Sequence, residues 1–300
     1  MVYRNIPYVP DGDRQQKLSV YLPIEEEDSL GMDYPVLVLA HSCGAGCEDV
    51  LLAETMRFVN QMGYAAVTID YRDDEGNGNP WTAHNDGACA VAWVYANADT
   101  YGLDVNRMAA FGNSYGAIVL SNLTLADDPN VFVSDCPNSL PSTKPFRGAV
   151  SFAAGVFGVP GEGLSIPSQE WAAFHVRHLH AADTAEELMA IHDALAKLPP
   201  TEWATSDELS QEARAYAQTW PAYWVNSSDP PFLLLVPEQD QYSPQREYEA
   251  FARLLEDAGV SFAYFVLSDA RHTSWGPTGQ VDPATWQEPI QQFLDSVLGE

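Results

Sequence analysis

Lysine is the scarcest charged residue of this chain. Only three of the 14 basic residues are lysines. The chain has 42 acidic residues, so its net charge is −28. Such a charge repels nucleic acid and anionic membranes, so the chain is expected to bind neither. Two interpretations of the acidity remain: a generic acidic, soluble surface, or an adaptation to high salt, where ions screen the repulsion between carboxylates.

Long apolar runs are also missing. The longest, such as residues 231–237, have the length of a buried strand and are too short to cross a membrane. The first residues lack the charged start and apolar centre of a signal peptide. A cytoplasmic location is therefore expected, with secretion left open.

Cysteine is rare. The four cysteines, Cys43, Cys47, Cys89 and Cys136, fit neither a zinc pattern nor a disulfide framework. Cys89 is expected in the core, and although Cys43 and Cys47 could pair, a reducing cytoplasm favours free thiols. His175, His178 and His180 have no carboxylate at a suitable spacing, so neither a metal nor another cofactor is expected.

Apolar runs and helical spacing alternate along most of the chain. Runs at residues 35–40, 64–69, 232–236 and 262–267 are typical of strands buried on both faces. Residues 17–22 alternate instead and predict an antiparallel edge strand. Helices are expected around residues 52–59, 85–98, 117–125, 244–258 and 283–298. The pattern predicts an α/β fold with a doubly wound, mostly parallel sheet.

This alternation stops between residues 160 and 229. The segment has helical stretches at 169–180, 185–198 and 206–218 and no convincing strand. We therefore expect a core domain formed by residues 1–159 and 230–300, with a helical cap at 160–229 over the ligand crevice. Trp203, Trp220 and Trp224 of this cap, with His41, are expected to line the substrate pocket. The alternative is a helical layer that only packs on the sheet.

One motif carries the chemistry. Gly112-Asn113-Ser114-Tyr115-Gly116 stands between an apolar strand and an apolar helical run, the setting of a G-x-S-x-G nucleophile turn. A serine on so sharp a turn takes a strained backbone, and side chains at the two glycine positions would collide with neighbours. Ser114 is therefore the expected nucleophile.

A serine nucleophile needs a base and a carboxylate that orients the base. Asp240 follows one predicted strand and His272 follows the next, in the chain order of this motif's partners. Glu238 and Asp269 are the alternative acids. The backbone amides expected to bind the oxyanion belong to Tyr115 and to the loop after residue 40, where Cys43 is preferred and Ser42 is next.

The chain resembles the α/β-hydrolase superfamily over nearly its full length. The stretch His41-Ser-Cys-Gly44, residues 63–72 and Asp104-Val-Asn-Arg107 are similar to esterases and dienelactone-hydrolase-like enzymes. The turn at Ser114 is also similar to that of prolyl-oligopeptidase-type peptidases. The resemblance implies a serine carboxylesterase acting on a small-molecule ester. An acyl-peptidase or aminopeptidase and a non-catalytic ligand-binding member are the alternatives, and a homodimer is possible.

Overall fold

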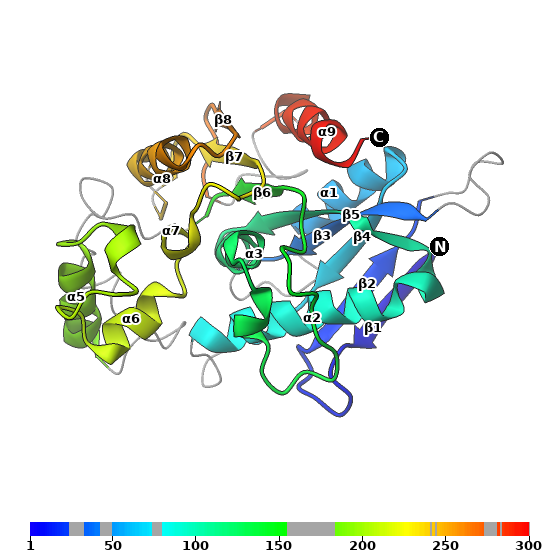
Figure 1. Cartoon of the computed structure of the whole chain (residues 1–300). Helices are drawn as coiled ribbons and strands as arrows, with labels where there is room; N and C mark the ends of the chain where they lie inside the picture. The colour runs from blue at the N-terminus through cyan, green and yellow to red at the C-terminus, as the bar shows by residue number, and fades with distance from the viewer. Residues whose placement is uncertain are drawn as a thin grey trace.

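A single mixed sheet organises the chain (Figure 1). The computed structural model describes residues 1–23, 33–42, 50–73, 80–154, 184–240, 242–243, 245–272, 281–282 and 284–299. Within these residues eight strands pair in the order β1-β2-β4-β3-β5-β6-β7-β8. They are β1 (Val2–Pro7), β2 (Lys17–Tyr21), β3 (Tyr34–Ala40), β4 (Ala65–Ile69), β5 (Leu103–Asn113), β6 (Ala149–Phe152), β7 (Phe232–Pro237) and β8 (Phe262–Leu267). The pairs from β4 to β8 are all parallel, which confirms the predicted α/β class.

The prediction for the antiparallel edge is wrong in one respect. Strand β2 is antiparallel to β4, but β1 lies outside it and is the true edge. Strand β1 was not visible in the sequence because its side chains are exposed or half-buried and give no apolar alternation. Its pairing with β2 also slips in register between Tyr3 and Ile6, where Asn5 has a φ of 56°.

Two helical layers cover the sheet. On β3, Val36 and Val38 point into one core, which α2 (Pro80–Tyr101), α3 (Tyr115–Leu125) and α8 (Gln245–Ala258) complete. Leu37 and Leu39 point into the other core, with α1 (Val50–Gln61) and α9 (Ala284–Leu298). Burial on both faces explains the continuous apolar runs. None of the helices in the described part of the chain is long and apolar enough to span a membrane.

The helices α5 (Ala185–Leu195), α6 (Gln211–Ala217) and α7 (Pro221–Trp224) lie beside the sheet in Figure 1. Their buried side chains form a third cluster around Trp203 and Trp220. Over residues 184–229, all of which are described, there is no strand. Residues 155–183 lie outside the described part, so the boundaries of the cap and the helix at 169–180 stay predictions.

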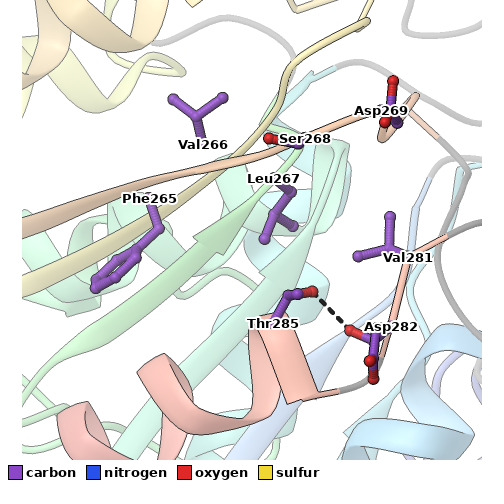
Figure 2. A pocket seen from close by; sticks show the side chains of 8 residues that line it. All are labelled: Phe265, Val266, Leu267, Ser268, Asp269, Val281, Asp282 and Thr285. Carbon is purple, nitrogen blue, oxygen red and sulfur yellow. Dashed lines mark hydrogen bonds between the residues drawn. The ribbon is translucent and has the colours of Figure 1, made fainter.

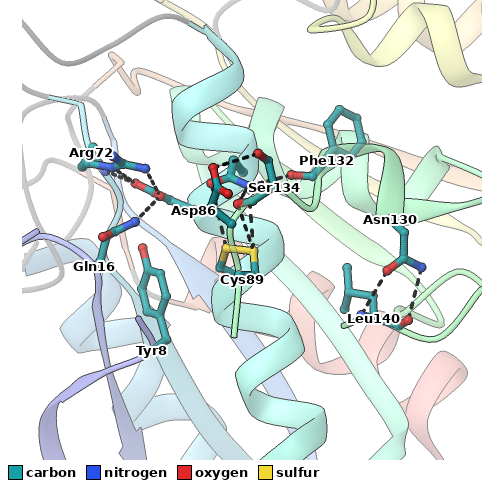
Figure 3. The surroundings of a disulfide bond; sticks show 12 residues. Tyr8, Gln16, Arg72, Asp86, Cys89, Asn130, Phe132, Ser134 and Leu140 are labelled. Atoms are coloured by element: carbon teal, nitrogen blue, oxygen red, sulfur yellow. Dashed lines mark hydrogen bonds and ion pairs between the residues drawn. A yellow bond between two sulfur atoms is a disulfide. The ribbon is translucent and has the colours of Figure 1, made fainter. Parts of the chain in front are cut away.

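Cys89 and Cys136 form a disulfide, so the expectation that this chain has none was wrong (Figure 3). Their Cα atoms are 5.3 Å apart, although 47 positions separate them in the sequence. Asn85, one turn before Cys89 on α2, donates hydrogen bonds to the carbonyls of Phe132 and Ser134. These contacts fix the loop after η2 (Pro129–Phe132) to α2. Cys43 and Cys47 lie outside the described residues.

Candidate active site

The turn at Ser114 has the strain that its motif predicts. Ser114 lies between β5 and α3 with φ 53° and ψ −120°, a backbone conformation that costs a non-glycine residue about 1–3 kcal/mol. A Cβ at Gly112 would collide with the backbone of Gly116 and Ala117. One at Gly116 would collide with the carbonyl oxygens of Ala40 and His41 on β3 and just after it. The two glycines therefore let the nucleophile turn pack directly against neighbouring backbone.

Two hydrogen bonds join the three predicted catalytic residues. The Ser114 Oγ lies 2.9 Å from Nε2 of His272, and Nδ1 of His272 lies 2.8 Å from Oδ2 of Asp240. Because the carboxylate only accepts, Nδ1 carries the proton and Nε2 is left to accept from the serine hydroxyl. The Asp240 side chain is fully buried, whereas His272 is 14% exposed. Strands β5, β7 and β8 deliver these residues at their carboxyl ends, which share one edge of the sheet.

The structure also separates Asp240 from the two alternative acids. Oδ1 of Asp240 accepts the backbone amides of Tyr242 and Ser243, both at 2.9 Å, which leaves Oδ2 directed at the imidazole. Glu238 instead accepts the backbone amide of Asp269 at 2.9 Å. The Asp269 carboxylate accepts from the Gln239 side chain. Glu238 and Asp269 thus tie two loops together.

The oxyanion hole is described in part. Tyr115 is the first residue of α3, and the amides in the first turn of a helix have no acceptor within the helix. The second predicted donor, Cys43, lies outside the described residues, and the carbonyl of Ser42 accepts a hydrogen bond from His41. The roles of Tyr115, Cys43 and Ser42 therefore remain predictions.

His41 does not line a pocket, because it has no exposed surface. Its Nε2 lies 3.0 Å from Oδ1 of Asp70 and its Nδ1 lies 2.6 Å from the Ser42 carbonyl oxygen. The ring stacks on Tyr71 with centroids 4.3 Å apart, and the Tyr71 hydroxyl donates to the His41 carbonyl. The side chain is therefore packed in the interior of the protein, directly after β3, where the loop predicted to bind the oxyanion begins.

This geometry sets the role of each ring nitrogen of His41. A carbonyl oxygen only accepts, so Nδ1 must donate to the Ser42 carbonyl, and Nε2 shares a proton with the Asp70 carboxyl group. Asp70 also accepts the Tyr71 amide at 3.1 Å and has the Lys17 ammonium 3.9 Å away. His41 and Asp70 therefore form a hydrogen-bonded pair, and sequence reasoning missed Asp70 as the partner of His41.

The three predicted pocket tryptophans have different surroundings. Trp203 has no exposed surface, and its Nε1 donates to the carbonyls of Leu195 and Leu198. Trp220 is 4% exposed and meets Trp203 edge-on at 5.7 Å. These two side chains form the centre of the third hydrophobic cluster, so contact with a substrate would require uncovering them.

Trp224 belongs to a different aromatic group. It meets Phe132 edge-on at 5.3 Å, and Phe132 stacks on His84 at 5.5 Å. His84 in turn meets Tyr115, next to the nucleophile, at 6.3 Å. Of the three tryptophans, Trp224 is the one that this chain of contacts connects to the nucleophile turn.

A cavity of about 210 Å³ lies beside the edge strand β8 (Figure 2). Its lining residues are Phe265, Val266, Leu267, Ser268, Asp269, Val281, Asp282 and Thr285. None of the three catalytic residues lines it, so it is not the site of the expected chemistry. Among the described residues no group of histidines, cysteines and acids is arranged to hold a metal, and His175, His178 and His180 lie outside them.

The parallel sheet and the strained serine turn define an α/β-hydrolase. A family model named BD-FAE matches residues 18–255, well over half of the chain. The chain therefore belongs to the BD-FAE family, whose members are esterases of the α/β-hydrolase type.

The comparisons with individual proteins agree with this family. Esterase LipQ of Mycobacterium tuberculosis is 24% identical over 242 residues, which cover 80% of this chain and 49% of LipQ. The chain thus spans about half the length of this curated relative. A truncated carbohydrate esterase from gut microbiota superposes with a TM-score of 0.73 at 13% identity, covering 100% of this chain and 97% of that one. Esterase 2 of Thermogutta terrifontis, phosphonylated by sarin, superposes with a TM-score of 0.71 at 17% identity, covering 98% of this chain and 95% of that one. At these identities the structural likeness concerns the fold.

Proposed function

We propose that this protein is a serine carboxylesterase that hydrolyses acyl esters through an acyl-enzyme. One observation carries the proposal: the two hydrogen bonds that join Ser114, His272 and Asp240 in the order that nucleophilic catalysis requires. Membership in a family of esterases supports it.

The reaction follows from these contacts. Ser114 Oγ bonds to the acyl carbon while its proton passes to Nε2 of His272, and the amide of Tyr115 binds the oxyanion. The bond from the acyl carbon to the alcohol oxygen then breaks, and the alcohol leaves with the proton held by His272. Water attacks the acyl-enzyme, gives one proton to His272 and releases the acid, and that proton returns to Ser114. Asp240 stabilises the imidazolium in both halves.

Replacing the nucleophile tests the proposal. Ser114→Ala removes one oxygen and is expected to lower kcat for p-nitrophenyl acetate by about 10⁴- to 10⁶-fold and to abolish labelling by a fluorophosphonate probe. Ser151→Ala is the matched control, because Ser151 lies on the adjacent strand β6 and is fully buried. Substantial hydrolysis by purified, folded Ser114→Ala would refute the mechanism.

The same preparation distinguishes the alternative functions. Amino-acid p-nitroanilides tested beside the p-nitrophenyl esters compare an amide with an ester leaving group. A higher kcat/KM for the anilides would assign a peptidase, and neither turnover nor labelling of Ser114 would assign a ligand-binding member. Because one similar structure is that of a carbohydrate esterase, the ester panel includes an acetylated sugar.

The disulfide bears on location. We propose that the protein works in an oxidising compartment, although its sequence led us to expect the cytoplasm, because disulfides form and persist where the surroundings are oxidising. Alkylation of thiols at harvest, followed by mass spectrometry, tests this: Cys89 and Cys136 should be unmodified until reduction. The homodimer remains a prediction.

A further inference from the structure

An exposed aromatic side chain contacts the proposed catalytic base. Tyr242 is 54% exposed, and its ring meets His272 at 62° with centroids 5.1 Å apart. Single exposed aromatics are ordinary on protein surfaces. Phe265 on β8, which is 40% exposed, is another among the described residues, but it lies at the cavity of Figure 2. Contact with His272 is what distinguishes Tyr242.

The position of Tyr242 is set by the catalytic carboxylate itself. Oδ1 of Asp240 accepts the amide of Tyr242 and the amide of Ser243. Ser243 is fully buried, and its hydroxyl donates to the carbonyl of Ala153. The backbone that carries the exposed ring is therefore anchored by the group that orients His272, which gives the ring a defined place relative to the base.

The proton transfer from His272 indicates which half of the ester lies near the Tyr242 ring. In the proposed esterase mechanism, on which this inference rests, His272 gives its proton to the leaving alcohol. The alcohol oxygen must then lie about 2.6–3.2 Å from Nε2. The oxyanion faces the Tyr115 amide, and among the described residues the rings of Tyr71 and His84 meet Tyr115. Tyr242 lies on the His272 side, within reach of a ring carried by the alcohol.

We propose that Tyr242 forms the binding surface for the alcohol half of the ester and favours alcohols that carry a ring. The face of an aromatic ring has negative charge and a large apolar area, so it attracts the C–H face of a pyranose or the edge of an aryl group. A pyranose and an aryl alcohol can therefore both bind to the Tyr242 ring in this way. An acyclic alcohol of two carbons has too little surface for such a contact.

Acetate esters that differ only in the alcohol test the inference. The substrates are an acetylated methyl pyranoside, phenyl acetate and ethyl acetate. Tyr242→Ala should lower kcat/KM about tenfold for a cyclic alcohol, mainly through KM, and change ethyl acetate less than twofold. Tyr242→Phe keeps the ring and should resemble the wild type, as should the control Phe265→Ala. A loss confined to the pyranoside assigns a sugar, and one confined to phenyl acetate assigns an aryl alcohol.

The deacylation rate distinguishes a subsite from a positioning role. The alcohol has left before water attacks, so the rate of acyl-enzyme hydrolysis should be unchanged in Tyr242→Ala. If deacylation and all three acetates decline together while fluorophosphonate still labels Ser114, Tyr242 acts by positioning His272 and the subsite is refuted, although the esterase function stands. If the wild type neither turns over an acetate nor is labelled, both proposals fail.

Discussion

Two histidine–aspartate pairs lie among the residues that the structure describes, and they differ in the group that the second ring nitrogen contacts. His272 bonds Asp240 at 2.8 Å, and its other nitrogen faces the hydroxyl of Ser114. His41 bonds Asp70 at 3.0 Å, and its other nitrogen faces the carbonyl of Ser42. A hydroxyl can donate, so the imidazole of His272 can stay neutral and act as a base. A carbonyl only accepts, so the His41 nitrogen that faces it must donate and cannot act as a base.

Burial reinforces the difference. The His272 side chain is 14% exposed, whereas that of His41 is fully buried. A base must exchange its proton with substrate and water, whereas both ring nitrogens of the buried His41 are hydrogen-bonded within the protein. The same residue types thus form the predicted catalytic base in one place and a structural contact with the backbone in the other. A histidine–carboxylate pair alone does not identify a catalytic base.

The largest difference between the two pairs is expected when each carboxylate is replaced by an amide. Asp240→Asn is expected to lower kcat by about 10⁴-fold, because an amide neither stabilises the imidazolium nor holds the correct tautomer. Asp70→Asn should lower kcat by about 10²-fold, because Asp70 contacts His41 and acts only through the loop that is predicted to bind the oxyanion. Steady-state hydrolysis of p-nitrophenyl acetate measures both. Glu238→Gln and Asp269→Asn are the controls and should remain near the wild type. If Asp240→Asn and Asp70→Asn lower kcat equally, the proposed difference between the two histidine–aspartate pairs is wrong.

Replacing His41 itself sharpens the comparison. His41→Gln can still donate hydrogen bonds but loses the ring and its stacking on Tyr71, so the loop that follows should shift relative to Ser114. Loss of an oxyanion donor costs about 10²- to 10³-fold in kcat, so a misplaced one should cost about 10²-fold with little change in KM.

The hydrogen bond that His41 donates to the Ser42 carbonyl can be measured directly. In ¹⁵N-histidine-labelled protein, one imidazole Nδ1 should show a one-bond N–H coupling that is absent in His41→Gln. If His41→Gln removes no such Nδ1 signal, this hydrogen bond is contradicted. If the fraction of His41→Gln that is unfolded at the assay temperature accounts for the whole loss of kcat, His41 contributes only to folding.

The contrast between the pairs also shows what a sequence can reveal. Ser114, Asp240 and His272 were predictable because each follows a strand, and parallel strands bring their carboxyl ends together. His41 and Asp70 also follow directly on two neighbouring strands, and the register that pairs Ala40 with Ile69 places them side by side. That signal was present in the sequence, but His41 was interpreted from its nearness to the oxyanion loop alone.

Other features had no comparable signal. The disulfide depends on the path of an irregular segment across α2, which no periodicity encodes. The exposed ring of Tyr242 depends on the hydrogen bonds of Asp240 with the following amides. Trp203 was predicted to line the pocket because aromatic residues favour both pockets and cores, and only its burial shows that it belongs to a core.

A third histidine extends the comparison to stability, where the smallest effect is expected. His192 of α5 is 4% exposed and packs against Trp220 at 4.8 Å and Tyr216 at 5.7 Å. Burial lowers its pKa to about 4, whereas a histidine in an unfolded chain has a pKa of about 6.5. Between these values the unfolded chain binds the proton and the folded chain does not. Stability from this group is therefore complete above about pH 6.5 and is lost as the pH falls toward 4.

At pH 5 the loss from His192 should be about 2 kcal/mol relative to pH 7.5. Urea unfolding at both pH values, in the wild type and in His192→Phe, measures this contribution to the free energy of unfolding. The carboxylates that also titrate contribute equally to both proteins. Phenylalanine keeps an aromatic ring in the cluster but cannot bind a proton, so the variant should lose less stability on acidification. Its stability at pH 7.5 can be higher or lower without affecting the result, since only the difference between the two pH values is compared. The same pH dependence in both proteins would mean that His192 is protonated in the folded state too, and that burial among aromatic rings does not keep it neutral.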